Sequence, residues 1–174
     1  MTRRFQQAPR GLDRTAFVAR FGRVYEHSPW IAETLFDQGV TAAHDTQDGL
    51  AAALRAVVEA GGITRQLALL RSHPDLAGKL AIAGTLTQES RGEQAGAGLD
   101  ACSPAEFASF QALNTAYKAR FGFPFILAVK GKSRLEILAA FEQRVAYDPA
   151  AEFRTALDQV HRIAYLRLGD FCAD

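Results

Sequence analysis

The chain has 174 residues, of which 48% are apolar and 22% are charged, a composition that excludes a wholly disordered or collagen-like protein. This length predicts a single domain over residues 1–174 with a sizeable core, in which residues 1–11 form a loosely ordered tail. Because 20 Lys and Arg residues nearly balance 19 Asp and Glu residues, no overall electrostatic field favours nucleic acid as a partner.

Apolar residues at helical spacing predict four helices in the first half of the chain. The first begins after Asp13, a possible N-cap, and is expected to end near Ser28 and Pro29. The others cover residues 29–39, 46–62 and 64–73, and each is bounded by a proline or by glycines.

The second half begins with residues 75–100, where five glycines and no long amphipathic pattern predict short helical turns joined by loops. From Ser103, which matches a capping box, a strong helix should run to about Arg120. The apolar run FPFILAV, residues 123–129, predicts a buried extended segment. Helices over residues 133–147 and 148–171 then complete an all-α fold, a compact multi-helix domain with one short extended segment.

The two cysteines, Cys102 and Cys172, show neither CxxC spacing nor a disulfide framework, which favours a reducing, cytoplasmic compartment. The longest apolar run has seven residues, whereas a helix needs about 20 to span a bilayer, so no membrane partner is expected. The basic start of the chain leads into no apolar core of a secretory signal.

The stretch SHPDLAGK, residues 72–79, places His73 directly before Pro74. Because Pro74 fixes its own φ and biases His73 toward extended geometry, the imidazole should project from a stiffened turn at a helix end. A histidine placed in this way suits proton transfer near neutral pH. On the pattern alone, the more common interpretation is a polar helix terminator, with Asp75 capping the next turn.

A second departure from plain helix packing is the stretch TLTQESRGEQAGAGL, residues 85–99. Ser90 and Glu93 have the spacing of a capping box, in which both side chains would only satisfy backbone N–H groups. Alternatively, Glu93 and the amide of Gln94 suit a ligand rich in urea-like N–H and C=O groups, because a carboxamide both donates and accepts.

Two further stretches are candidate contact sites for a polar ligand. The irregular start of the run at residues 122–124 leaves backbone amides that must find partners, although a buried core element explains the run as well. In the last helix, Arg162 and Arg167 interrupt apolar positions. Such an arginine usually keeps its charged head in water, but one that points inward needs an anion.

Nothing in the sequence indicates a metal site, because the four histidines and two cysteines show no close ligand spacing. His44 and Asp45 form an HD pair of the kind found in helical metal phosphohydrolases, but the remaining ligands of such a site are not evident. No phosphate-binding or dinucleotide-binding loop is present either, so we expect a cofactor-free reaction.

Five stretches, taken in order, resemble the successive blocks of the 2-oxo-4-hydroxy-4-carboxy-5-ureidoimidazoline (OHCU) decarboxylases: YEHSPWIAE, SHPDLAGK, LTQESRGEQAGAGLD, FQALNTAYKARFGFPFILAVKG and RIAYLRLGD. The resemblance runs from about Phe17 to Asp170, nearly the whole chain. The combination of His-Pro-Asp-Leu-Ala-Gly, Ser-x-x-Glu-Gln and Phe-Gly-Phe-Pro-Phe in this order is highly specific.

The resemblance implies an all-α enzyme of urate breakdown, usually a homodimer, that needs no cofactor. Its substrate would be OHCU, a small-molecule ureide, and its products (S)-allantoin and carbon dioxide. The resemblance places the catalytic residues on His73, Glu93 and Arg167, with Arg167 preferred to Arg162. It places substrate contacts on Pro74, Ser90, Glu93, Gln94, Phe125, Ile126, Leu127, Ala128 and Val129.

The sequence departs from this family pattern in one block. The residues from Arg144 to Tyr147 read Arg-Val-Ala-Tyr where the family commonly has Arg-Leu-x-Asn, so no asparagine role is carried over there. The C-terminal FCAD is not a peroxisomal tripeptide, which favours a bacterial-type cytoplasmic enzyme. The rival interpretations are a non-catalytic helical ligand-binding module and a metal phosphohydrolase that uses His44 and Asp45.

Overall fold

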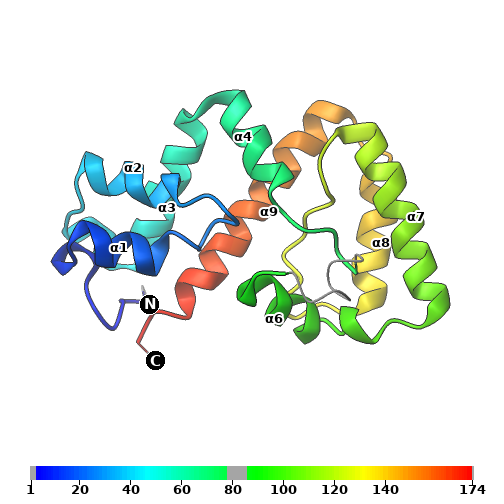
Figure 1. The fold of residues 1–174 in the computed structure, drawn as a ribbon, viewed down its shortest axis with the longest axis horizontal. Helices are drawn as coiled ribbons and strands as arrows, with labels where there is room; N and C mark the ends of the chain where they lie inside the picture. Colours follow the sequence, from blue (N-terminus) through cyan, green and yellow to red (C-terminus); the bar gives the residue numbers. More distant parts are fainter. Residues whose placement is uncertain (1–2, 78–85, 174) are drawn as a thin grey trace. The chain divides into compact units, whose positions relative to one another are not determined.

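The computed structural model describes residues 3–77 and 86–173, shown as a ribbon in Figure 1. The Gly78 and Lys79 end of the SHPDLAGK motif therefore lies outside the described residues. The chain divides into two compact units, one holding residues 3–72 and 160–173 and the other residues 73–77 and 86–159. Within these residues, regular structure is helical and is joined only by two isolated bridges, which confirms the all-α class.

The first unit is built on four α-helices, two 3-10 turns and the end of the last helix. The α-helices have the predicted order and the caps that the sequence indicates: the Asp13 carboxylate accepts the Ala16 N–H, and Gly39, at φ 109°, ends the second helix. The elements are α1 Arg14–Phe21, α2 Trp30–Gln38, α3 Gln47–Ala60, α4 Gly62–Arg71, η1 Pro9–Gly11 and η2 Ala42–Asp45.

The prediction of a first helix reaching Ser28 is wrong, because α1 ends at Phe21. Val24 and Tyr25 are buried, as their helical spacing suggested, but they are buried by a chain of tight turns. The N–H of Val24 bonds to the carbonyl of Phe21 three residues earlier, and His27 adopts φ 46°. A left-handed residue cannot continue a right-handed helix, so the helix stops before this stretch.

Residues 3–11 are not the loosely ordered tail that the sequence suggested. Phe5 is only 7% exposed, and its ring packs edge-on against Phe21. The backbone around it pairs with the other end of the chain, where the Ala173 N–H donates to the Arg4 carbonyl and the Gln6 N–H to Phe171. One buried aromatic ring with paired backbone on both sides is enough to dock a short terminal segment.

The second unit begins at His73 and contains helices α6, α7 and α8 and the first part of α9. Where residues 75–100 were expected to form only short turns, the described part contains a helix of nine residues and one 3-10 turn. The elements are α6 Gln88–Gly96, η3 Leu99–Ala101, α7 Pro104–Phe121, α8 Arg134–Arg144 and α9 Pro149–Gly169.

Residues 123–129 connect α7 to α8 without helix or strand, and every one of them is buried, as predicted. The core around them is aromatic. The ring of Phe125 stacks on Phe141 with centroids 3.9 Å apart, and Tyr117 packs edge-on against Phe125 at 5.4 Å. This irregular segment is therefore held from both sides by large rigid side chains.

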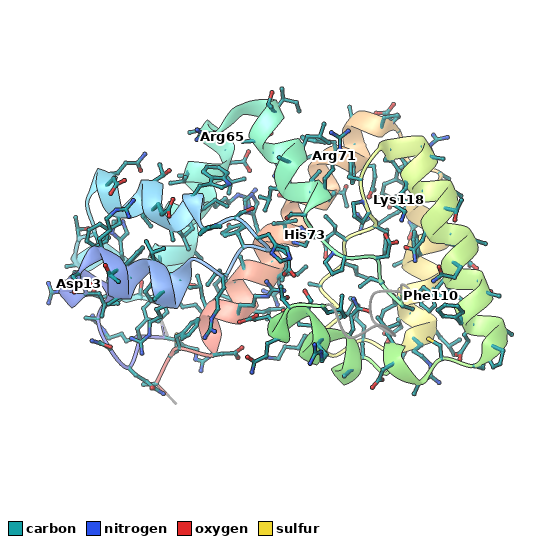
Figure 2. All side chains as sticks on the ribbon, in the orientation of Figure 1. Asp13, Arg65, Arg71, His73, Phe110 and Lys118 are labelled. Carbon is teal, nitrogen blue, oxygen red and sulfur yellow. The ribbon has the colours of Figure 1, made fainter. Side chains whose placement is uncertain are left out.

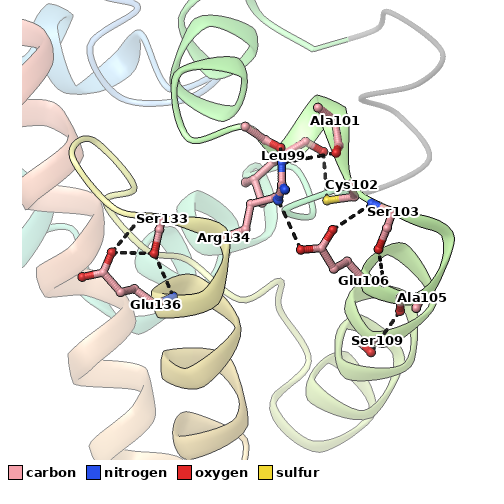
Figure 3. Close-up of polar contacts among 11 residues, drawn as sticks. Leu99, Ala101, Cys102, Ser103, Ala105, Glu106, Ser109, Ser133, Arg134 and Glu136 are labelled. Atoms are coloured by element: carbon pink, nitrogen blue, oxygen red, sulfur yellow. Dashed lines mark hydrogen bonds and ion pairs between the residues drawn. The ribbon is translucent and has the colours of Figure 1, made fainter.

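Capping boxes start both α7 and α8, as Figure 3 shows. The Ser103 N–H donates to the Glu106 carboxylate at 2.8 Å, and the Ser133 N–H donates to Glu136 at 2.7 Å. These backbone hydrogen bonds are the main reason that the pKa of each carboxyl lies below its ordinary value. Arg134 adds a bridge from α8 to Glu106 and to the carbonyls of Gly98 and Ala101.

No helix among residues 3–77 and 86–173 combines the length and the apolar character needed to cross a membrane.

Candidate active site

His73, labelled in Figure 2, is the first residue of the second unit and comes directly after Ser72, the C-cap of α4. Its side chain is only 8% exposed, and Pro74 follows it, so the imidazole belongs to a stiffened segment rather than to a solvated helix end. The preceding Ser72 belongs to the first unit, where its hydroxyl lies 2.8 Å from the Glu26 carbonyl oxygen.

The carboxamide of Gln94 ties the segment after His73 to α6. The Gln94 side-chain oxygen accepts the Ala77 N–H at 3.1 Å, and its nitrogen donates to the Asp75 carbonyl at 3.3 Å. Gln94 is the residue next to Glu93, so the helix that carries the predicted catalytic glutamate is joined directly to the segment that carries the predicted catalytic histidine.

The start of α6 shows whether Ser90 and Glu93 form a capping box. Its N-cap is Thr87, whose hydroxyl accepts the Ser90 N–H, so the interpretation of Ser90 and Glu93 as a capping box is wrong. Glu93 lies in the second turn of the helix and is half-buried. Ser90 and Gln94, at the i and i+4 positions, are each 4% exposed, and together with Glu93 they form one face of the helix.

The predicted substrate-contacting segment, residues 125–129, is anchored by a buried ion pair. Arg144 donates through Nη1 to the Ile126 carbonyl at 2.7 Å, and through Nε to the Glu152 carboxylate at 3.0 and 3.1 Å. The hydroxyl of Tyr117 donates to the same carboxylate. The Ala128 N–H donates to the Gln159 side-chain oxygen at 3.0 Å, so α9 holds the segment as well.

Arg167 lies in the part of α9 that belongs to the first unit and is 6% exposed. Its Nη1 lies 2.9 Å from Glu26 Oε2 and 3.4 Å from the Val24 carbonyl oxygen. Arg162 is exposed, and its guanidinium lies over the ring of Tyr165. The arginine that points inward thus has an anion beside it, as the cost of burying an unpaired charge requires.

A second polar group in the first unit was not anticipated from the sequence. The Tyr25 hydroxyl lies 2.8 Å from His161 Nδ1, and His161 Nε2 lies 3.1 Å from Glu59 Oε1. Tyr25 and His161 are both buried, and burial raises the pKa of the Tyr25 phenol. The three residues come from three separate parts of the chain, so no local spacing could have revealed them.

The His44 and Asp45 pair has structural partners in the first unit. His44 Nδ1 accepts the Thr41 N–H in the cap of a 3-10 turn, and Asp45 pairs with Arg10 at 2.9 Å. Across the part of the chain that the structure describes, no group of three or more His, Cys, Asp or Glu side chains is arranged to hold a metal ion.

The sequence profile of the OHCU decarboxylase family matches residues 10–169. The chain belongs to this family. An OHCU decarboxylase of Haloferax volcanii is 45% identical over 159 residues, which cover 91% of this chain and 90% of that protein. One of Halalkalicoccus jeotgali is 43% identical over 90% of this chain and 85% of its own.

A solved structure of an (S)-allantoin synthase is similar in fold, with a TM-score of 0.73 and 33% identity. The similarity covers 93% of this chain but only 52% of that one, so this chain spans about half of that protein.

The site residues that the OHCU decarboxylase resemblance points to divide between the two units. His73, Pro74, Ser90, Glu93, Gln94 and residues 125–129 all belong to the second unit, and Arg167 belongs to the first. Three residues of α7 that contact the His73 segment were missed: Gln111, Asn114 and Lys118. Their spacing of three and four residues places three polar side chains on one helix face, but the same pattern is typical of a face exposed to solvent, so the sequence did not single them out.

Proposed function

We propose that this chain is a carboxy-lyase that converts OHCU to (S)-allantoin and carbon dioxide in urate breakdown. The family match over residues 10–169 supports the reaction. The observation in the structure that supports the site is the carboxamide of Gln94, which joins the helix of Glu93 to the segment of His73.

The substrate itself can accept the electrons that the reaction releases. Its carboxylate is bonded to a carbon that also bears a hydroxyl, next to a ring carbon doubly bonded to nitrogen. When the bond to the carboxylate breaks, carbon dioxide leaves and the electron pair flows into the imine, which gives an enol. The protein then has to orient the carboxylate, stabilise the developing charge and deliver a proton to one face of the enol.

We assign proton handling to His73, with Glu93 as its partner, because buried His73 and half-buried Glu93 belong to one unit, in segments that Gln94 joins by hydrogen bonds. Arg167 is the proposed partner of the substrate carboxylate, through charge-assisted hydrogen bonds. Since Glu26 already balances the charge of Arg167, this arginine would recognise a carboxylate by the direction of its N–H groups more than by net charge.

The ureido and ring amides of the substrate are proposed to contact Pro74, Ser90, Gln94 and the backbone of residues 125–129. Gln94 already pairs with Ala77 and Asp75, but a carboxamide has two N–H groups and two acceptor lone pairs, so a substrate contact is compatible with both bonds. We propose further that the enzyme works without a cofactor, as a homodimer in the cytoplasm.

The test supplies OHCU freshly made from urate and follows the chirality of the allantoin by circular dichroism. The chain should accelerate the decay of OHCU to (S)-allantoin and leave urate and 5-hydroxyisourate untouched. His73→Ala and Glu93→Ala should each lower turnover by on the order of 10²-fold or more while the melting temperature stays close to that of the parent.

Racemic allantoin formed at the uncatalysed rate by the parent protein would refute the proposed reaction. If the protein instead bound the ureide tightly without turnover, it would be a helical ligand-binding module. Normal turnover in the Glu93 variant would remove Glu93 from the mechanism and leave the reaction itself in place.

A further inference from the structure

The backbone that follows His73 is held by side chains rather than by secondary structure. Three carboxamides serve its three consecutive carbonyls: Gln94 donates to Asp75 at 3.3 Å, Asn114 to Leu76 at 3.0 Å and Gln111 to Ala77 at 2.9 Å. Buried carbonyls must find donors, and among the described residues these three donors are amide side chains of α6 and α7.

Helix α7 supplies its contacts in register. Gln111, Asn114 and Lys118 are separated by three and four residues, so they form one stripe along the helix. The stripe meets the segment in reverse order, because Gln111 contacts Ala77, Asn114 contacts Leu76 and Lys118 pairs with the Asp75 carboxylate at 2.6 Å. The segment thus runs antiparallel to one face of α7, on which Figure 2 marks Lys118.

The backbone conformation of Ala77 explains why these side-chain hydrogen bonds are needed. It adopts φ 48°, a left-handed conformation that an alanine rarely takes and that persists only where surrounding contacts impose it. Both of its polar backbone groups are held, the N–H by Gln94 and the carbonyl by Gln111. These two bonds help to keep Ala77 in this conformation, so their loss should change the path of the chain back to His73.

We propose that Gln111 and Asn114 are positioning residues that fix the orientation of His73 through the backbone of residues 75–77. The inference rests on the proposed role of His73 in proton transfer. Pro74 stiffens the connection between the held carbonyls and His73, so a shift of the segment is passed on to the imidazole rather than absorbed in between. A misplacement of about 1 Å in a catalytic group can cost up to on the order of 10²-fold in rate.

The test compares Gln111→Met and Asn114→Leu, which keep most of the side-chain volume and lose the donor, with Thr115→Val as the control. Thr115 is exposed on the same helix, and its hydroxyl donates to the Gln111 carbonyl of that helix. We expect kcat to fall about 10- to 100-fold in both amide variants with little change in KM, and to stay at the parent value in Thr115→Val.

A second readout does not depend on turnover. The chain has only four histidines, so the imidazole NMR signals can be assigned by single substitutions. The His73 signal should shift or broaden in Gln111→Met and Asn114→Leu, while the signals of His27, His44 and His161 stay in place. A role limited to global stability would lower the melting temperature and leave the His73 signal and kcat of the folded protein unchanged.

The two readouts separate failure of this inference from failure of the proposed function. Parent-like kcat and an unmoved His73 signal in both amide variants, with His73→Ala inactive, would overturn the positioning role and leave the function intact. If the parent itself did not turn over OHCU, the function would fail, and the NMR signal would still show whether the amides position His73. Gln111 is half-buried, so its variant should fold even if the Asn114 variant does not.

Discussion

The two units each contain a buried arginine paired with a buried glutamate, and the two pairs contact different parts of the fold. Arg144 and Glu152, in the second unit, are 5% and 0% exposed, and Arg167 and Glu26, in the first, are 6% and 2% exposed. The first pair joins residues eight positions apart, whereas the second joins positions 141 apart. The two pairs are thus equally buried, but one is local in the sequence and the other joins distant parts of the chain.

The partners of each pair show the difference. Arg144 also donates to the Ile126 carbonyl and lies 4.5 Å above the ring of Phe125, while Tyr117 donates to Glu152. Each of these groups belongs to the core around residues 123–129, so this pair supports the fold of that segment. Arg167 and Glu26 instead hold the turn after α1, and the resemblance assigns Arg167 a role toward the substrate. The structural role of the Arg144 pair rests on its surroundings, whereas the functional role of the Arg167 pair is a proposal that rests on the resemblance.

The largest effect on stability is expected when the pair of Arg144 and Glu152 is broken. Glu152→Gln leaves the buried Arg144 without a counter-charge, which should lower the free energy of unfolding by about 3 kcal/mol or more. Glu142→Gln, at an exposed position of α8, should change it by less than about 0.5 kcal/mol. Urea unfolding followed by circular dichroism measures both. A loss as small as that of the control would mean that the Arg144 pair does not support the second unit.

The next effect tests the proposed role of Arg167 by comparing two ligands, one with the carboxylate and one without it. Arg167→Lys keeps a positive charge beside Glu26 but loses the planar fork, so kcat/KM for OHCU should fall roughly tenfold or more. The inhibition constant of allantoin, which lacks the carboxylate, should change much less. Arg162→Lys, at an exposed position of the same helix, is the matched control and should alter neither value. Equal losses for both ligands would show that Arg167 does not read the carboxylate.

The smallest effect on stability is expected at Glu136, whose carboxylate is exposed, unlike those of the two buried pairs. The Ser133 N–H lowers the pKa of the Glu136 carboxyl, so its contribution to stability is present above the ordinary value of 4.5 and is lost as the pH falls through the lowered value. The stability difference between the parent and Glu136→Gln should therefore be small at pH 7 and vanish in acid. Thermal unfolding from pH 7 to pH 3 would show this, and a difference independent of pH would contradict it.

Local signals explain which parts of the fold the sequence could predict. The caps at Asp13, Gly39 and Ser103 act within a few residues of the chain, and they appear where the pattern indicated. The end of α1 and the docking of Phe5 depend on contacts with distant residues, such as the bridge to Cys172, and periodicity carries no information about them.

The candidate site shows the same limit. His73 and Glu93 stood out through proline geometry, carboxylate and amide pairing and the family resemblance. The bonds of Gln94 to Ala77 and Asp75 were not visible, because the motif suggested a ligand as the partner of its amide. Asn114 contacts a carbonyl 38 positions earlier, and an asparagine inside a helix carries no mark of such a partner. Long-range pairing therefore had to come from the structure.

The choice of uncharged carboxamides to hold the His73 segment affects how ionic strength should enter the kinetics. Amides neither titrate nor attract counterions, so added salt leaves the bonds of Gln94, Gln111 and Asn114 unchanged. Salt does screen attraction between charges, and the screening distance falls to about 3 Å at 1 M. Salt also weakens the ion pair of exposed Lys118 with Asp75, but the three amide bonds should keep the geometry around the imidazole while the attraction of an anionic substrate weakens. KM should therefore respond to salt before kcat does.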